Sequence, residues 1–159
     1  MATDVIFTRS GSAANVIEEL IRQARLTVDA ALYRFSNRRL ARALGDAAAR
    51  GVAVRLVLNS NDHYEENRAA QETLRDYGIA FRLSRGRGGP GSKMHHKFAV
   101  FDRRWVVTGS YNWTLESEGS NYENLLALGS RRVAVEYSRE FEKLWAEGGA
   151  SAGSVKNQD

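Results

Sequence analysis

The sequence predicts a single α/β domain in which a central mixed, largely parallel sheet is flanked by helices. Over the first half of the chain, apolar runs of strand length alternate with apolar residues at helical spacing, as in domains built on a parallel sheet. After residue 92, two closely spaced apolar runs and one long amphipathic pattern indicate a hairpin and a closing helix. With 159 residues, the chain is long enough for one domain with a hydrophobic core.

The first half of the chain carries the clearest element signals. Ser12 and Ser36 are expected to cap two helices at their N-termini, and Gly51 and Gly78 to end the second and third helices. The expected elements are strands over residues 5–8, 26–32, 52–58 and 79–83, with helices over 12–24, 36–51 and 65–77 between them.

The second half begins with a basic, glycine-rich loop over residues 84–92. A hairpin follows, with strands over 98–101 and 105–108 and a turn at 102–104, and a further strand is expected over 125–128. The closing helix is predicted from an apolar stripe made of Val133, Tyr137, Phe141, Leu144 and Trp145. The domain is therefore expected to cover residues 1–147, and the small, polar residues 148–159 to form a disordered tail.

Composition narrows the possible functions only in part. The chain has no cysteine, which excludes disulfides, thiolate catalysis and cysteine-based zinc sites. Its formal net charge of +4 weakly favours an anionic partner. No secretory signal and no bilayer-spanning apolar run is visible, so the chain as given is expected to be soluble and cytoplasmic. A periplasmic or secreted protein whose leader had been removed would look the same.

A local cluster of cations surrounds two histidines and a lysine. His95 and Lys97 stand two residues apart at the start of a predicted strand, so their side chains should share one face. Residues 81–104 contain seven Lys or Arg residues and one carboxylate, Asp102. An enzyme that attacks a phosphodiester needs a nucleophile and cations around the non-bridging oxygens, and this cluster offers both. The alternative is that the histidines only cap a strand and the arginines form a solvated surface.

Polar residues after the next two strand signals strengthen the catalytic interpretation. Ser110 and Asn112 follow one strand and could donate hydrogen bonds to phosphate oxygens. Glu123 precedes the other and could accept a hydrogen bond from a ring nitrogen of His95, which would fix its tautomer. The alternative for Ser110 and Asn112 is a turn motif, and for Glu123 a charge at a strand edge.

Three blocks of sequence together resemble the phospholipase D superfamily. The resemblance is greatest to its single-motif branch, which includes the bacterial Nuc-type endonucleases and the Zucchini or mitochondrial cardiolipin hydrolase group. It covers nearly the whole chain and implies a phospholipase D-like sandwich fold. The three blocks are Met94 to Asp102, with the signature His95-x-Lys97-(four residues)-Asp102, then Gly109-Ser110-Tyr111-Asn112-Trp113-Thr114, then Asn121 to Leu125.

The resemblance implies a role for each matching residue. His95 would be the nucleophile that forms a phosphohistidine, and Lys97 would bind the phosphate with Ser110 and Asn112 beside it. Glu123 matches the acid that orients the histidine, so the expected catalytic residues are His95, Lys97 and Glu123. Asp102 completes the signature and is expected to be structural.

One copy of the signature supplies only half of a two-step mechanism. The displacement needs a general acid for the leaving oxygen as well as a nucleophile. Single-motif relatives bring two chains together, so we expect a homodimer in which a second His95 protonates the leaving group. No carboxylate cluster suited to a metal is visible, and we expect neither a metal nor another cofactor.

The sequence favours nucleic acid over phospholipid as the substrate. The basic loop could track a phosphate backbone, with Arg85, Arg87 and Lys93 as contacts. Trp113 could stack on a base, although core packing is an equally good interpretation. The sequence as given shows no counterpart of the membrane anchor or of the cysteine-containing zinc element of the Zucchini group, which also leads us to expect a nuclease. The alternatives are a phospholipase D or cardiolipin hydrolase, and a catalytically silent nucleic-acid-binding module.

Overall fold

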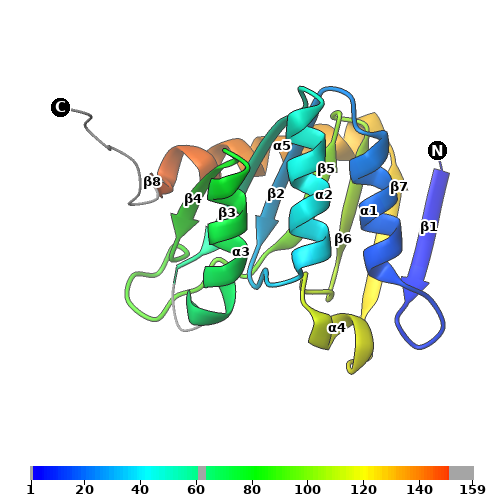
Figure 1. The fold of residues 1–159 in the computed structure, drawn as a ribbon, viewed down its shortest axis with the longest axis horizontal. Helices are drawn as coiled ribbons and strands as arrows, with labels where there is room; N and C mark the ends of the chain where they lie inside the picture. Colours follow the sequence, from blue (N-terminus) through cyan, green and yellow to red (C-terminus); the bar gives the residue numbers. More distant parts are fainter. Residues whose placement is uncertain (1, 61–63, 151–159) are drawn as a thin grey trace.

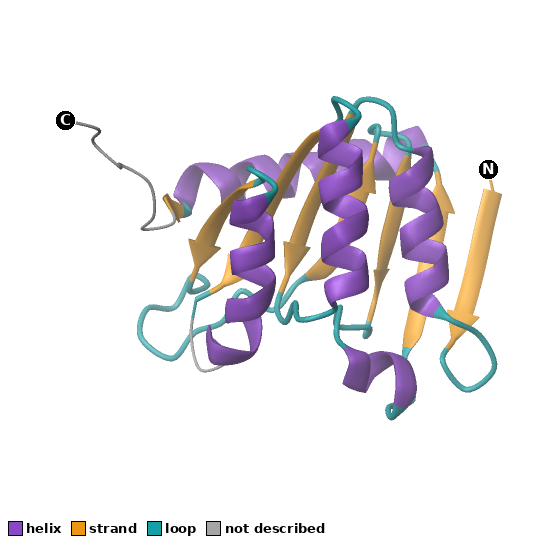
Figure 2. Ribbon diagram, viewed as in Figure 1, coloured by secondary structure: helices purple, strands orange, loops and turns teal. Residues whose placement is uncertain are grey.

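A mixed sheet with helices on both faces forms the molecule, as Figures 1 and 2 show. The computed structural model describes residues 2–60 and 64–150. In this part of the chain the sheet has eight strands in the order β1-β7-β6-β5-β2-β3-β4-β8. The strands are β1 (Ala2–Phe7), β2 (Thr27–Leu32), β3 (Ala53–Asn59), β4 (Ala80–Ser84), β5 (Lys97–Phe101), β6 (Trp105–Gly109), β7 (Asn124–Gly129) and β8 (Gly149–Ala150).

Three helices form the front layer in Figure 1, namely α1 (Ala13–Gln23), α2 (Arg38–Ala49) and α3 (Tyr64–Asp76). Ser12 caps α1 as expected, with its hydroxyl accepting a hydrogen bond from the backbone N–H of Asn15. The cap of α2 is Asn37 rather than Ser36, because the Asn37 side chain accepts from the N–H groups of Arg39 and Leu40. Apolar residues at helical spacing, such as Ile17 and Ile21 of α1, are completely buried against the sheet.

The prediction of a mixed sheet flanked by helices is confirmed, but the expectation of a largely parallel sheet is wrong. Only the β2–β3 and β3–β4 pairs are parallel, and the other five neighbouring pairs are antiparallel. The strand–helix alternation that produces parallel pairs ends at β4. The chain then returns to the middle of the sheet, where β5 pairs antiparallel with β2 and turns into β6 through a tight hairpin.

The back of the sheet is covered by α5 (Arg131–Glu147), the predicted closing helix. Arg55 on β3 joins this helix to the sheet: its guanidinium donates to Asp29 at 2.9 and 3.0 Å and to Glu142 at 2.6 Å. It also lies 5.0 Å from the ring centre of Phe141 and 5.3 Å from that of Trp145. Burial raises the pKa of the Asp29 carboxyl, while Arg55 favours its charged form.

Two short elements were not predicted. Residues 149 and 150 form β8, which pairs with β4, so the tail expected from residue 148 cannot begin before residue 151. The remainder of that tail lies outside the described residues. The other element is α4 (Leu115–Gly119), capped by Thr114 and located between the Ser110 block and Glu123.

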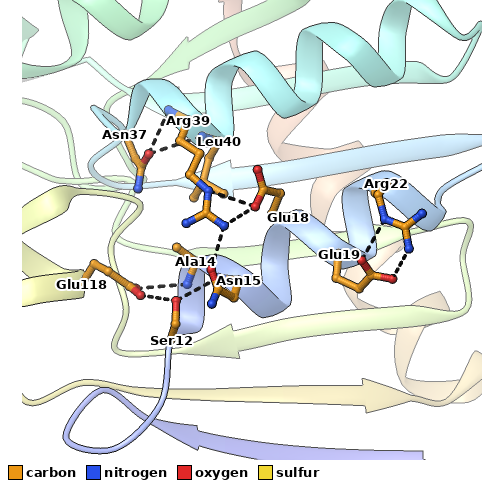
Figure 3. Close-up of polar contacts among 10 residues, drawn as sticks. All are labelled: Ser12, Ala14, Asn15, Glu18, Glu19, Arg22, Asn37, Arg39, Leu40 and Glu118. Carbon is orange, nitrogen blue, oxygen red and sulfur yellow. Dashed lines mark hydrogen bonds and ion pairs between the residues drawn. The ribbon is translucent and has the colours of Figure 1, made fainter.

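Figure 3 shows how α4 is joined to the front layer. The carboxylate of Glu118 accepts hydrogen bonds from the Ser12 hydroxyl and, at 3.0 Å, from the backbone N–H of Ala14 at the start of α1. A carboxylate is well placed there, because the first turn of a helix has unpaired N–H groups. The segment that contains α4 is therefore fixed to the N-terminus of α1.

Candidate functional site

His95, Lys97, Ser110 and Glu123 lie at one end of the central strands, on the side of the sheet where α4 is drawn in Figure 1. The end of β2 is in register with the start of β5, since Leu32 pairs with Lys97. The end of β6 is in register with the start of β7, since Gly109 pairs with Leu125. This pairing brings the His95 block, the Ser110 block and the segment around Glu123 to one edge, although they are far apart in the sequence.

His95 and Lys97 are in contact. The Nζ atom of Lys97 lies 3.2 Å from Nδ1 of His95 and donates to the His95 carbonyl oxygen at 2.9 Å. The sequence expectation that both side chains share one face is therefore met by the geometry. An imidazole and an ammonium held this close can act on the same phosphate group.

The electrostatic surroundings of His95 favour its neutral form. Desolvation is the largest influence, followed by the positive charges of Lys97, Lys93 and His96, and together they hold the pKa of His95 below its ordinary value of 6.5. Burial also lowers the pKa of Lys97, while the nearby Glu123 carboxylate favours its charged form. A neutral imidazole has the lone pair that a nucleophile needs.

The predicted role of His95 as a nucleophile implies a pH dependence of activity that reports this lowered pKa. A nucleophilic imidazole is inactive when protonated, so kcat/KM should fall as the pH drops through the pKa of His95, with the midpoint below pH 6.5. Replacing Lys93 by Gln removes a positive charge that lowers the pKa of His95, and should therefore move this midpoint upward. Lys143→Gln, in the same groove, is the matched control and should leave the midpoint unchanged. A wild-type midpoint above pH 7 would contradict the assignment.

Tyr33 is a site residue that the sequence analysis missed. It directly follows β2 and is 7% exposed. Its ring centre lies 4.4 Å from that of the His95 imidazole and 5.0 Å from Nζ of Lys97. The ring packs against the His95 imidazole and thereby limits its rotation. It also stabilises the Lys97 cation. The available signal was an aromatic residue at the end of a buried strand, where ligand sites commonly form.

Ser110 and Glu123 lie together at the same edge. The Ser110 hydroxyl donates to Glu123 and accepts from the backbone N–H of Asn124 at 3.0 Å. Gly109 makes this approach possible, because a Cβ atom there would lie 2.3 Å from the carbonyl oxygen of Asn124. The Glu123 carboxylate also accepts hydrogen bonds at 3.3 Å from Ser117 and from Asn121.

Two expected side-chain roles are not visible in the described chain. The hydrogen bonds of Glu123 there go to Ser110, Ser117 and Asn121, and none goes to His95. Asn112 forms no side-chain hydrogen bond with the described residues, and its buried Oδ1 atom lacks a partner there. The orienting role of Glu123 and the phosphate contact of Asn112 therefore stay predictions.

Asp102 lies at the opposite edge of the sheet from His95, at the turn after β5. Its carboxylate accepts hydrogen bonds from the backbone N–H groups of Arg25 at 2.9 Å, Leu26 at 2.7 Å and Thr27 at 2.9 Å. Burial alone would raise its pKa, but these hydrogen bonds outweigh it and hold the pKa below the ordinary value of 3.8. Its place supports a structural role.

The proposed nucleic-acid contacts divide into two groups. Arg85, Arg87 and Lys93 are exposed, and the last two line a groove of about 550 Å³ that also contains His95 and reaches α5. The prediction that Trp113 stacks on a base is wrong. Its side chain is 1% exposed and packs edge-on against Phe35, with ring centres 5.8 Å apart. Its backbone is also hydrogen-bonded to the segment after β2, which draws the side chain into the core.

Comparisons with known proteins agree with this geometry. Residues 17–145 match the family model described as "Cardiolipin synthase, PLD-like domain". The chain is 38% identical over 128 residues to the mitochondrial cardiolipin hydrolase of Xenopus tropicalis and 35% identical over 136 residues to that of Homo sapiens. These alignments cover 80% and 86% of this chain but 59% and 52% of the two relatives, so the chain spans only part of their length.

Two solved structures show the same fold. Nuc from Salmonella typhimurium, a phospholipase D family member, superimposes with a TM-score of 0.87 at 24% identity, covering 96% of this chain and 99% of that one. NucT from Helicobacter pylori superimposes with a TM-score of 0.78 at 23% identity, covering 94% and 98% of the two chains. Both likenesses extend over nearly the whole chain.

Proposed function

Because the chain belongs to the phospholipase D-like superfamily of phosphodiesterases, we propose that it is a metal-independent nuclease that uses His95 as its nucleophile. The observation that carries this proposal is the contact between His95 and Lys97 at a cationic edge of the sheet. Lys97 provides the charge that a metal ion would otherwise supply at the non-bridging oxygens.

The proposed reaction has two displacements. An imidazole nitrogen of His95 attacks the phosphorus, and the bond from phosphorus to the leaving oxygen breaks as that oxygen takes up a proton. Water then attacks the phosphohistidine, which releases a phosphomonoester and restores the imidazole. Lys97 and Ser110 would stabilise the charge on the phosphate oxygens, and Asn112 is the third proposed contact. Glu123 is the proposed orienting acid.

The proton for the leaving oxygen is proposed to come from a second copy of the chain. The described residues contain one His95-x-Lys97 pair, and no other imidazole is placed beside it to act on the opposite side of the phosphate. His96 is directed to α5 instead, where its ring nitrogen lies 3.3 Å from Glu140. A two-fold homodimer would place two His95 side chains on one phosphate.

Nucleic acid is the proposed substrate because exposed cations continue from the site along the 84–93 loop. Arg87 and Lys93 line the groove next to His95, and Arg85 extends the positive surface. A second candidate is a phospholipid, since the curated relatives are named cardiolipin hydrolases. None of the helices in the described ranges combines the length and apolar character of a membrane-spanning segment.

A substrate panel in the presence of EDTA tests the proposal. We expect cleavage of single-stranded DNA, RNA or duplex DNA, with turnover unchanged when EDTA is replaced by Mg²⁺. Vesicles of phosphatidylcholine with cardiolipin, assayed for phosphatidic acid release, should react at least about tenfold more slowly. Faster release from vesicles would select the phospholipid candidate. Activity that disappears in EDTA and returns with Mg²⁺ would contradict the mechanism.

A further inference from the structure

Tyr122 is an aromatic residue whose side chain is exposed at the protein surface. It is 79% exposed, the highest value among the large apolar and aromatic side chains in the described ranges. The guanidinium carbon of Arg9 lies 4.2 Å from its ring centre, so one face of the ring is covered by a cation and the other faces solvent.

The backbone on both sides of this ring is fixed. The N–H of Glu123 donates to the Thr8 hydroxyl at 2.8 Å, and that hydroxyl donates to the carbonyl oxygen of Asn121 at 2.7 Å. The N–H of Thr8 in turn donates to the carbonyl oxygen of Glu123 at 3.0 Å. Exposure of Tyr122 is therefore a feature of an ordered segment, and the side chain is presented in a defined place.

The position of Tyr122 relates it directly to the catalytic edge. It is the neighbour of Glu123, whose carboxylate holds Ser110 and lies near enough to Lys97 to favour its charge. Consecutive Cα atoms are about 3.8 Å apart, and a tyrosine ring extends several ångströms further. Tyr122 therefore lies in the segment that borders the phosphate position proposed for Lys97 and Ser110.

We propose that Tyr122, with Arg9 on one ring face, is the platform on which a base of a single-stranded nucleic acid stacks next to the cleaved phosphate. The inference rests on the proposed nuclease function and assigns its substrate-positioning residue. Every base has an aromatic face, so a single stacking residue binds without sequence preference. The open ring face accepts the base, and Arg9 adds a charge near the backbone.

The surroundings of the ring favour a base over a lipid chain. Tyr122 follows Ser120 and Asn121 and precedes Glu123, so its chain neighbours are polar and one is an anion. Insertion of the ring into a bilayer would bury these polar neighbours in hydrocarbon, whereas stacking on a base leaves them in water. Phe7, which is 58% exposed and pairs with Asn124, and Leu115 of α4, which is 73% exposed, are apolar side chains of the same region that could assist a lipid contact.

Substitutions that separate stacking from hydrophobicity test the proposal. Tyr122→Trp keeps an aromatic face, whereas Tyr122→Leu keeps an apolar side chain and loses the face. Binding is measured by fluorescence anisotropy in the His95→Ala background, with single-stranded DNA and with an abasic phosphodiester oligomer of equal length. We expect Tyr122→Leu to weaken DNA binding about tenfold and Tyr122→Trp to stay within about threefold of Tyr122. Neither change should affect the abasic oligomer.

Controls keep the outcomes distinct. Leu26→Ala, which truncates another exposed side chain at the opposite edge, should leave DNA binding unchanged. Equal DNA affinity for Tyr122→Leu and Tyr122 would overturn the inference, as would a Tyr122→Leu protein that becomes monomeric in light scattering, because Tyr122 would then serve an interface. Loss of binding to cardiolipin vesicles alone would assign it to lipid. Wild-type protein that cleaves no nucleic acid would refute the nuclease function independently of these variants.

Discussion

His95→Ala is expected to lower phosphodiester cleavage by at least about 10⁴-fold, because it removes the atom that we propose attacks phosphorus. Binding of single-stranded DNA should stay within about threefold of wild type, since Arg87, Lys93 and Lys97 keep their charges. Cleavage is followed with a labelled oligonucleotide in EDTA, and binding by fluorescence anisotropy. A protein that binds nucleic acid but shows no cleavage before or after the substitution would be the silent binding module instead.

The neighbouring histidine provides the matched control. His96 is half exposed and contacts Glu140 and Phe98, away from the proposed reaction centre. His96→Ala should therefore keep cleavage within about tenfold of wild type. A loss as large as that of His95→Ala would mean that the nucleophile has been misassigned.

Mixed dimers extend the same prediction to the shared site. When wild-type and His95→Ala chains carrying different tags are co-expressed, the purified heterodimer should have less than about 1% of wild-type activity, because one imidazole cannot both attack and protonate. Light scattering should give twice the mass of one chain. Heterodimers with half of the wild-type activity, or an active monomer, would refute a shared site.

Asp102→Ala is expected to destabilise the fold by about 3 kcal/mol while leaving the chemistry in place. The substitution removes the acceptor of three backbone N–H groups at the start of β2. Asp102 also has a φ of 51°, a left-handed conformation that Ala tolerates less well than Asp. Urea unfolding measures the loss, and kcat at 20 °C should stay within about threefold of wild type. An inactive but fully stable variant would contradict this division of roles.

The contribution of Asp102 should depend on pH in a defined direction. Its pKa is lower in the folded state than its ordinary value of 3.8, so its charge stabilises the fold above about pH 4. That stability is lost as the pH falls through the folded-state pKa. The difference in unfolding free energy between wild type and Asp102→Asn should therefore shrink below about pH 4. Asn tolerates the same backbone conformation, which makes it the matched variant.

Much of the fold followed from local patterns. The helical spacing of Ile17 and Ile21 and the short apolar run before Asp102 are local properties, and their elements formed as predicted. Strand partners are a property of the whole chain, which is why the number of parallel pairs was overestimated. The short helix α4 has one buried residue, Ser117, so there is no apolar stripe from which it could be predicted.

For the same reason, some residues of the candidate site could be predicted from the sequence and others could not. His95 and Lys97 share a face because strand side chains alternate, and this can be derived from spacing alone. Tyr33 joins them only through the pairing of β2 with β5, which no local pattern contains. Trp113 and Tyr122 both flank the site in the sequence, and only three-dimensional packing decides that the first is buried and the second exposed.

β5 separates the residues of the signature that we propose to be catalytic from the one that we propose to be structural. Lys97 begins this strand, His95 lies two residues before it, and Asp102 lies just beyond its end, roughly 16 Å from Lys97 at about 3.3 Å per residue. Selection can therefore act on the two ends separately. A relative that keeps the aspartate but has lost the histidine should still fold and would be a pseudoenzyme. A relative that keeps the histidine and lysine but not the aspartate must brace β2 by another means.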